Sequence, residues 1–314
     1  MVEGDTSLAG QRVLVTGGSG FVGRTLVPEF RQHGADVVVL DRQPYPDADV
    51  PTIRGDMTDP SVRDGAVTPD LTGIVHLAAI TSVLRSAEAP QETFDTNVEV
   101  TQGLLELARQ RHVGQFVLAS TNAVVGNVGT STITEDSPLR PLTPYGATKA
   151  ACEMLLSGYA GSYGIATCAL RFTNIYGPGM AAKDSFVPRL MRAALAGDGV
   201  QVYGDGKQAR DLVHVSDIAA GVVAAWRHGY AGTAILGAGR SVTVLDLIEA
   251  ARAATGAALP ITHVPAKTGE MPAVIVDISR AATEFGYQPT IDLTAGLGTV
   301  WADFAANNTV TAPR

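Results

Sequence analysis

Apolar runs alternate with helix-length segments through the first half of the chain. The runs, rich in Val, Ile and Leu, cover residues 12–16, 36–41, 73–79, 115–120 and 165–172. The segments between them that space apolar residues three or four apart are 21–33, 91–111 and 145–163. Strands that are apolar on both faces and separated by helices form a parallel sheet that helices cover on both sides. The pattern therefore predicts a doubly wound α/β fold.

This alternation of apolar runs and helical segments becomes less regular after residue 172. The turn-rich segments NIYGPGMAAKDS and QVYGDGKQARD interrupt it, and short strands and helices follow to the end of the chain. We therefore expect a large domain over residues 1–172, with segments around 211–238 returning to its sheet. The rest, residues 173–210 and 239–314, is expected to form a smaller C-terminal lobe.

Composition narrows the class of protein. Of the 314 residues, 46% are hydrophobic and 17% are charged, which favours a buried core over disorder. No apolar run approaches the roughly 20 residues that cross a bilayer, and the first ten residues lack an export signal. We expect a soluble, cytoplasmic protein without a membrane partner.

Net charge and cysteine content exclude further classes of protein. The formal net charge of −8 argues against a nucleic-acid partner, so any anionic ligand must be met by local arginines, lysines and helix ends. Cys152 and Cys168 lie in apolar segments without metal-ligand spacing, so both are expected to be reduced core residues. The two cysteines thus predict neither thiol redox chemistry nor a zinc site.

One short stretch concentrates glycine. In VLVTGGSGFVG, residues 13–23, the predicted first strand ends at Gly17, and GSGFVG fits G-x-G-x-x-G at the start of a helix. Such a turn lets a pyrophosphate approach the backbone and places the helix N-terminus beside it. The next strand ends at Asp41, where a carboxylate can hold the ribose diol of NAD and repel a 2′-phosphate. Neighbouring Arg42 keeps NADP as an alternative, and a purely structural glycine turn is the other.

The spacing of Gly17, Gly20 and Gly23 resembles that of the short-chain dehydrogenase/reductase superfamily. From residue 13 to about 280 the chain is similar to its extended branch, the NAD-dependent nucleotide-sugar epimerases and dehydratases typified by UDP-glucose 4-epimerase. The resemblance implies a Rossmann domain that binds NAD and a C-terminal lobe that binds a nucleotide-sugar. It assigns to the cofactor Gly17, Gly20, Phe21, Val22, Gly23, Asp41, Arg42, Asp56, Met57, Leu77, Ala78, Ala79, Asn97, Tyr145 and Lys149. For Asp56, a helix-capping turn ahead of TDPS is the alternative.

The segment TPYGATKAACE carries the candidate catalytic pair. Thr143 can cap a helix that begins at Pro144, which places Tyr145 and Lys149 on one helix face. The ordinary pKa of tyrosine is about 10, and a nearby ammonium group lowers it. We therefore expect Lys149 to lower the pKa of Tyr145 and make it a proton acceptor. Because Tyr-x-x-x-Lys is common by chance, this assignment depends on the glycine turn as well.

The stretch LASTNAVVG supplies the third catalytic residue and bears on the reaction. Thr121 matches the family's catalytic Ser/Thr, whose hydroxyl binds the reacting sugar oxygen, and Ser120 is the alternative, expected to turn inward. Family members that dehydrate or decarboxylate resemble one another in an Asp-Glu or Ser-Glu pair directly after this hydroxyl. Here Asn122 and Ala123 stand there, and alanine cannot exchange a proton. Val125 replaces the family's usual tyrosine, which puts local packing in doubt.

These residues favour NAD-dependent epimerisation of a nucleotide-sugar at C4. The reaction would pass through a 4-keto intermediate, with Tyr145 as base and NAD as the bound hydride carrier. Three alternatives stay open: an NAD-dependent sugar or polyol dehydrogenase that releases NADH, a dehydratase or decarboxylase, and a non-catalytic cofactor-sensing protein.

The resemblance also implies substrate contacts. It assigns them to Thr121, Asn174, Tyr203, Arg210, Lys267 and Val274. Asn174 and Arg210 would bind the diphosphate, Tyr203 would lie near the nucleobase, and Lys267 stands where the family often has an arginine. A UDP-sugar is the expected substrate, and helices 91–111 and 145–163 are the expected surface of a homodimer.

Two of these assignments have alternatives. Arg210 can instead form a surface ion pair with Asp211 or Asp205. Val274 falls where related epimerases flank the sugar's 2-position, so a small side chain there would admit N-acetyl sugars. It can equally be an ordinary strand residue in AVIVDIS.

Overall fold

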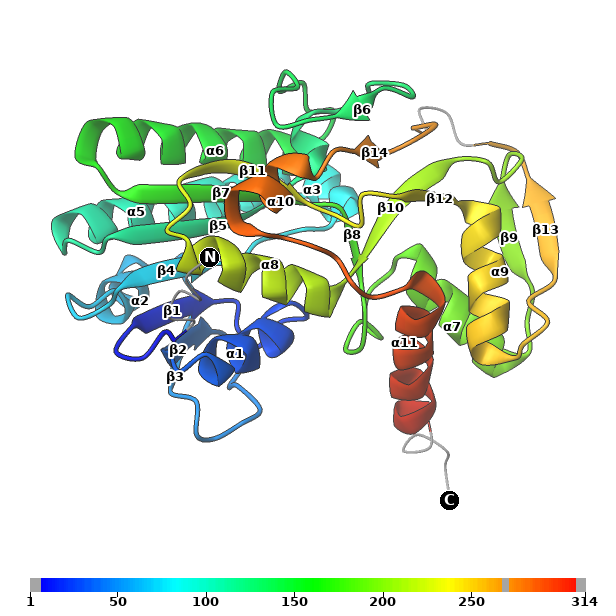
Figure 1. Cartoon of the computed structure of the whole chain (residues 1–314), viewed down its shortest axis with the longest axis horizontal. Helices are drawn as coiled ribbons and strands as arrows, with labels where there is room; N and C mark the ends of the chain where they lie inside the picture. Colours follow the sequence, from blue (N-terminus) through cyan, green and yellow to red (C-terminus); the bar gives the residue numbers. More distant parts are fainter. Residues whose placement is uncertain (1–6, 267–270, 309–314) are drawn as a thin grey trace.

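The computed structural model describes residues 7–266 and 271–308. Its main feature is a seven-stranded sheet in which every pair of neighbouring strands is parallel. In spatial order the strands are β11 (Gly232–Leu236), β7 (Ala166–Phe172), β5 (Gln115–Thr121), β4 (Gly73–His76), β1 (Arg12–Thr16), β2 (Asp36–Asp41) and β3 (Thr52–Arg54) (Figure 1). The strand order reverses at β1, between β2 and β4, and ligands bind at such a point in doubly wound folds. The predicted doubly wound α/β fold is confirmed.

Helices cover both faces of this sheet, because its strands are apolar on both sides. One face packs against α1 (Gly23–Gln32), α8 (Val215–Arg227) and α10 (Ser279–Phe285). The other packs against α2 (Pro60–Ala66), α5 (Val100–Gln110) and α6 (Pro144–Tyr163). Alternation along β1 divides its side chains between the two cores, with Val13 and Val15 in the first and Leu14 in the second.

The predicted helix 91–111 is interrupted in the structure. It divides into α4 (Pro90–Phe94), a π-helical turn η1 (Asp95–Glu99) and α5, and a short helix α3 (Val83–Glu88) precedes it. Asn97 lies in the π-helical turn and is 1% exposed. Its amide bonds both backbone groups of Ile80, which supports the wide turn locally.

The second half of the chain builds a smaller group of elements beside the sheet (Figure 1). It contains the three-stranded sheet β12 (Ser241–Thr243), β10 (Ala209–His214) and β8 (Asn174–Tyr176), and the parallel pair β13 (Ile261–Val264) and β9 (Val200–Tyr203). Its helices are α7 (Phe186–Ala196), α9 (Val244–Thr255) and α11 (Leu293–Asn308). They share a separate apolar core that includes Leu190, Val202, Ile248 and Leu297.

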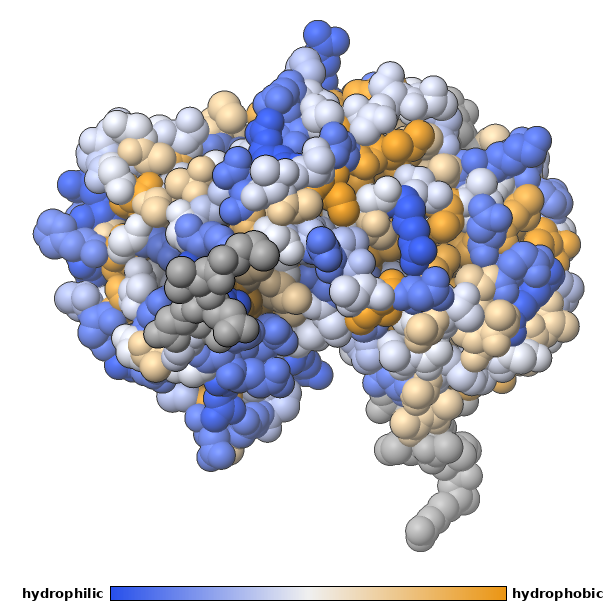
Figure 2. Space-filling view, viewed as in Figure 1, coloured by the Kyte–Doolittle hydropathy of each residue, from blue (hydrophilic) through white to orange (hydrophobic). Residues whose placement is uncertain are grey.

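The two halves are joined by chain crossings and by a small strand pair. After β10, the chain returns through α8 to β11 at the edge of the large sheet. β6 (Thr132–Ile133) pairs with β14 (Ile275–Val276), and a 3-10 turn η2 (Asn122–Val124) follows β5. The space-filling view shows an indentation between the halves along one edge, with α1 on one side and α11 on the other (Figure 2). Within the described ranges, no helix combines the length and the hydropathy needed to cross a membrane.

Candidate active site

A cleft of about 1640 Å³ lies between the carboxyl ends of the large sheet and the smaller group of elements. Eighteen of the predicted site residues line it: Gly17, Gly20, Phe21, Val22, Gly23, Asp41, Arg42, Asp56, Met57, Leu77, Ala78, Ala79, Thr121, Tyr145, Lys149, Asn174, Tyr203 and Arg210. Residues that are far apart in sequence thus share one cavity, as the strand ends of a parallel sheet allow.

The glycine turn is built for close backbone approach. Gly17 has a positive φ of 71°, and a Cβ atom there would lie 2.8 Å from the backbone nitrogen of Ala78. A Cβ atom at Gly23 would collide with the carbonyl oxygens of Gly17 and Gly18. Only glycine therefore fits at these two positions.

The same turn presents free backbone donors to the cleft. Helix α1 begins there without a side-chain cap and without an acidic residue in its first turn. Among the described residues, the N–H groups of Phe21 and Val22 have no protein acceptor. Unpaired N–H groups at a helix N-terminus attract an anion, so the turn fits a pyrophosphate.

Two carboxylates lie on the cleft wall at the ends of β2 and β3. Asp41 accepts backbone hydrogen bonds from Ser19 at 3.1 Å and Gln43 at 3.0 Å, which hold the carboxylate at the turn. Asp56 accepts from the backbone N–H and the hydroxyl of Thr58, at 3.0 and 2.8 Å, and these bonds lower its pKa. The cap of α2 is Asp59, so Asp56 forms a turn before the helix cap and also faces the cleft.

Asn97 lies behind the cleft and bonds the backbone of Ile80, which lines it. Its Oδ1 accepts from the backbone N–H of Ile80 at 2.8 Å, and its Nδ2 donates to the Ile80 carbonyl at 3.1 Å. Nδ2 also donates to the Thr148 hydroxyl at 3.0 Å. Asn97 therefore ties the loop after β4 to helix α6, one residue before Lys149, without reaching the cavity itself.

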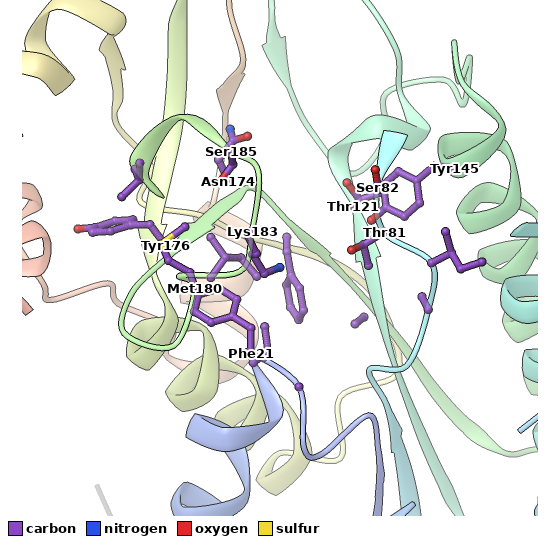
Figure 3. Close-up of a pocket in the computed structure, with 18 of the residues that line it drawn as sticks. Phe21, Thr81, Ser82, Thr121, Tyr145, Asn174, Tyr176, Met180, Lys183 and Ser185 are labelled. Carbon is purple, nitrogen blue, oxygen red and sulfur yellow. The ribbon is translucent and has the colours of Figure 1, made fainter. Parts of the chain in front are cut away.

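The candidate catalytic residues meet at the end of β5 and the start of α6. The Thr143 hydroxyl accepts from the N–H of Gly146 at 3.1 Å and caps α6 as predicted, with Pro144 in its first turn. Tyr145 and Lys149 face the cleft from this helix, and Thr121 faces it from the strand (Figure 3).

The pKa of Tyr145 differs from the prediction. Burial raises it to about 12, and a side-chain hydrogen bond with Thr121 acts in the opposite direction. The expected lowering by Lys149 is therefore wrong, because loss of water around the phenolate dominates.

Lys149 is almost fully buried, at 2% exposure. Burial lowers its pKa, while nearby Cys152 and Glu153 raise it. Burial and, to a lesser extent, the charge of Lys149 lower the pKa of His76 to about 3, so His76 is neutral. Lys149 thus lines the sheet end of the cleft as an almost fully buried amine.

Ser120 turns inward, as expected of the alternative hydroxyl. It donates to Glu153 at 2.5 Å, and Glu153 forms a buried ion pair with Arg171 at 2.7 Å. Arg171 also donates to the carbonyl of Glu135 at 3.1 Å. These bonds connect the strand that carries Thr121 with the helix that carries Tyr145.

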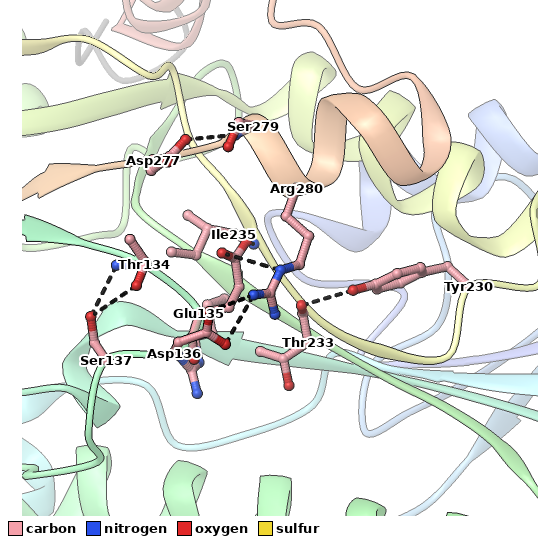
Figure 4. A network of polar contacts seen from close by, with 11 residues as sticks. Thr134, Glu135, Asp136, Ser137, Tyr230, Thr233, Ile235, Asp277, Ser279 and Arg280 are labelled. Carbon is pink, nitrogen blue, oxygen red and sulfur yellow. Dashed lines mark hydrogen bonds and ion pairs between the residues drawn. The ribbon is translucent and has the colours of Figure 1, made fainter.

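The loop that contains Glu135 is held in turn by other elements (Figure 4). The Glu135 carboxylate accepts from the backbone N–H of Ile235 in β11 at 2.9 Å. Arg280 of α10 lies 3.7 Å from that carboxylate and 2.8 Å from the carboxylate of Asp136. The strand that carries Thr121 and the helix that carries Tyr145 therefore rest on a network that extends to the edge of the sheet.

Three predicted substrate residues line the opposite wall. Asn174 donates to the Asp211 carbonyl at 2.9 Å, which leaves its own side-chain carbonyl free to accept. Tyr203 and Arg210 follow on β9 and β10. The carboxylates suggested as alternative partners of Arg210 have other contacts, since Asp211 bonds the Thr173 hydroxyl at 2.7 Å and Asp205 pairs with Lys207 at 3.8 Å.

Two predicted substrate residues are not found on the cleft wall. Lys267 lies outside the described residues. Val274 is 7% exposed and packs in a small apolar cluster with Val124, Val125 and Ile133. Its position gives the predicted gate for sugar size no support, because Val274 directly precedes β14 and its side chain packs in this core cluster.

Sequence reasoning missed several residues of the cleft. Thr81, Ser82, Met180, Lys183 and Ser185 all line it, and Figure 3 shows them around the cavity. Thr81 and Ser82 come two and three residues after the end of the predicted strand 73–79, which is a signal that could have marked them. Lys183 lies in a turn-rich segment, where nothing in the local pattern indicates the direction of a side chain.

A doubly wound sheet with a glycine turn at its switch point, and Thr, Tyr and Lys on the same cleft, define the short-chain dehydrogenase/reductase class. The model of the NAD dependent epimerase/dehydratase family matches residues 13–237, and the chain belongs to that family.

Similar proteins within the family catalyse two different reactions. A dTDP-glucose 4,6-dehydratase of an Actinoplanes species is 34% identical, with 94% of this chain and 98% of that protein covered. A UDP-glucose 4-epimerase of Corynebacterium glutamicum is 31% identical, with 93% and 95% covered. The structure of the Thermus thermophilus UDP-glucose 4-epimerase in complex with NAD is 31% identical, has a TM-score of 0.85 and covers 94% of this chain and 99% of its own. The cofactor of this family is NAD, and the glycine turn described above fits it.

Proposed function

We propose that this protein is a nucleotide-sugar 4-epimerase with NAD as a bound cofactor. The observation that carries the proposal is the chemistry beside Thr121. Ala123 has no ionisable group, and Asn122 is 7% exposed, buried behind the cleft rather than on its wall. Dehydration needs an additional acid and base to remove water from carbons 5 and 6.

The carboxylates on the cleft wall do not supply that group. Among the described residues they are Asp41, Asp56 and Glu92. Asp41 and Asp56 lie at the ends of β2 and β3, and Glu92 is paired with Arg85 at 2.8 Å. Epimerisation at one carbon requires only a single proton acceptor, so the residues present suffice.

The roles of the catalytic residues follow from their positions. When bound, NAD would supply the hydride acceptor and donor for the sugar carbon. Tyr145 removes the proton of the hydroxyl on that carbon and gives it back, and Thr121 donates to the same oxygen and orients it. Lys149 follows Tyr145 by one helical turn on the cleft wall and is proposed to bind the cofactor beside it. Substrate binding displaces water from the cleft, which strengthens each of these interactions.

We extend the proposal to the two halves of the chain. Residues 1–172 and about 211–238 would bind NAD, through Asp41 and Asp56 on the adenosine side and the glycine turn on the pyrophosphate. The lobe of residues 173–210 and 239–314 would bind a nucleotide-sugar, with Asn174 and Arg210 on its diphosphate and Tyr203 near the base. UDP is the expected nucleotide, since UDP-glucose 4-epimerases are among the similar proteins.

We also propose a homodimer. Helix α6 exposes Met154 and Tyr163, at 58% and 55%, although both are apolar or aromatic. Phe94 of α4, at 44%, and Leu84 of α3, at 70%, add to the exposed apolar surface of the helices that pack on α6. Monomers rarely leave such helices uncovered, so a second copy of the chain is the expected partner.

The experiment that tests the reaction is conversion of UDP-glucose by the purified protein, followed by proton NMR of the sugar and by absorbance of free NADH. We expect the C4 epimer to appear without accumulation of NADH. A 6-deoxy-4-keto sugar would identify a dehydratase, and NADH accumulating with an oxidised sugar would identify a dehydrogenase.

A further inference from the structure

Lys183 is one of the cations on the cleft wall that form no ion pair with a carboxylate of the described residues. The cleft is lined by the basic residues Arg24, Arg42, Arg85, Lys149, Lys183, Arg189 and Arg210. Arg85 and Arg189 are held by the carboxylates of Glu92 and Asp184, at 2.8 and 2.7 Å. Within the described ranges, no carboxylate lies within ion-pair distance of the Lys183 ammonium, in contrast to these arginines.

The position of Lys183 is fixed by its loop. The segment 177–185 connects β8 to α7, and the Lys183 N–H donates to the Met180 carbonyl at 2.9 Å. Gly179 donates to Asp303 of α11 at 2.9 Å, and Arg192 reaches the Lys183 carbonyl at 3.5 Å. The loop therefore holds its lysine against the cavity from several sides.

The side chain points across the cleft to the glycine turn. Its Nζ lies 4.8 Å from the centre of the Phe21 ring. Figure 3 shows Lys183 reaching into the cavity beside Phe21, with Tyr145 and Thr121 on the far wall. Phe21 belongs to the turn whose N–H groups are unpaired, so the ammonium and these donors face the same part of the cavity.

Lys183 is an exposed residue on the cleft wall, so its ammonium keeps part of its hydration. Surrounding protein removes water from it and lowers its pKa. An aromatic ring offsets only part of that loss, because its attraction is weaker than that of an anion. A bound anion would provide the missing partner.

We propose that Lys183 binds the pyrophosphate of NAD from the wall opposite the glycine turn. The turn supplies neutral N–H donors, and Lys183 supplies the positive charge that the turn lacks. A nucleotide-sugar carries the same diphosphate chemistry, but contact with Phe21 places Lys183 at the cofactor end of the cleft. The inference rests on the NAD site of the family and is independent of the reaction catalysed.

The test is the dissociation constant of NAD for the full chain after nucleotide removal, measured by titration calorimetry. Lys183→Met should weaken NAD binding about tenfold or more, the scale of one charge-assisted hydrogen bond to phosphate. Lys183→Arg should stay within about threefold of the unmodified chain, because the charge remains. Lys207→Met is the matched control: it removes one exposed lysine that pairs with Asp205 outside the cleft, and NAD binding should not change.

Two further ligands test whether Lys183 binds the diphosphate of NAD or that of the substrate. Adenosine has no phosphate, so its affinity should be equal in the Lys183→Met variant and the unmodified chain. UDP represents the substrate diphosphate, and its affinity should change less than about twofold. Loss of UDP affinity with intact NAD affinity, or no change in either, would overturn the proposal. Lys183→Gln repeats the test with a polar side chain if the methionine variant fails to fold.

Discussion

At the scale of single residues, the chemistry of Tyr145 depends on a helix start that is local in sequence and on surroundings that are not. Thr143 and Pro144 mark a helix start within four residues of sequence, so the placement of Tyr145 and Lys149 on one face followed directly. The pKa of Tyr145 depends on walls contributed by distant segments, and burial raises it to about 12 against the expected lowering. Val274 shows the same limit, because its side chain packs against Val124, Val125 and Ile133, which are distant in sequence.

Thr121 should control the pH dependence of the reaction through Tyr145. Its hydrogen bond lowers the pKa of Tyr145, so Thr121→Val should raise that pKa further. The phenolate is the active base, and kcat/KM rises with pH as it forms. The variant's rising limb should therefore move to higher pH, with activity at neutral pH lowered about tenfold or more. The measurement is the pH profile of kcat/KM.

Thr121→Ser is the control for this pH profile. It keeps the hydroxyl, so its rising limb should coincide with that of the unmodified chain. A Thr121→Val profile with uniformly lower activity and an unmoved limb would show that Thr121 does not act on the pKa of Tyr145.

At the scale of elements, periodicity predicted most of the sheet and its helices. The apolar runs 12–16 and 36–41 coincide with β1 and β2, because strands buried on both faces need continuous apolar sequence. The run 73–79 continues past the end of β4 at His76. The π-helical turn at Asn97 was not predictable, since it depends on hydrogen bonds to Ile80 and Thr148, which are distant in sequence.

The buried ion pair between Glu153 and Arg171 should contribute strongly to folding. Their side chains are 2% and 4% exposed. Glu153→Gln leaves the Arg171 charge buried without its partner, which should lower the free energy of unfolding by about 3–5 kcal/mol. Urea denaturation monitored by circular dichroism measures the change.

Glu249→Gln is a matched control for this stability measurement. It breaks an ion pair with Arg252 at 2.6 Å on the surface of α9, where the Glu249 side chain is 66% exposed. Its effect should be much smaller, because solvent compensates exposed charges. Equal losses in the two variants would contradict the role assigned to the buried pair.

At the scale of the whole molecule, the doubly wound parallel sheet could be predicted from the alternation of strands and helices. The sequence pattern did not indicate from which side the second lobe contributes side chains to the cleft. Lys183 illustrates this, since its loop is set by contacts with Asp303 and Arg192 in two other helices. Folding of the two halves against each other decides which polar residues reach the ligands.

The proposed homodimer also concerns the whole molecule. We expect sedimentation equilibrium at micromolar concentration to give twice the mass of one chain, because α6 exposes Met154 and Tyr163. Met154→Glu would place a charge in the proposed interface and should shift the protein toward monomer. A monomeric mass for the unmodified chain would remove the proposal.

Transfer of hydrogen at C4 is the step on which the proposed reaction depends. The most direct measurement follows UDP-glucose that carries deuterium at C4, incubated with the purified protein in ordinary water and observed by NMR. The proposed reaction predicts the C4 epimer with deuterium retained at C4, because NAD returns the same hydrogen that it accepted. Deuterium recovered in free NADH, or at C6 of a 6-deoxy product, would contradict it.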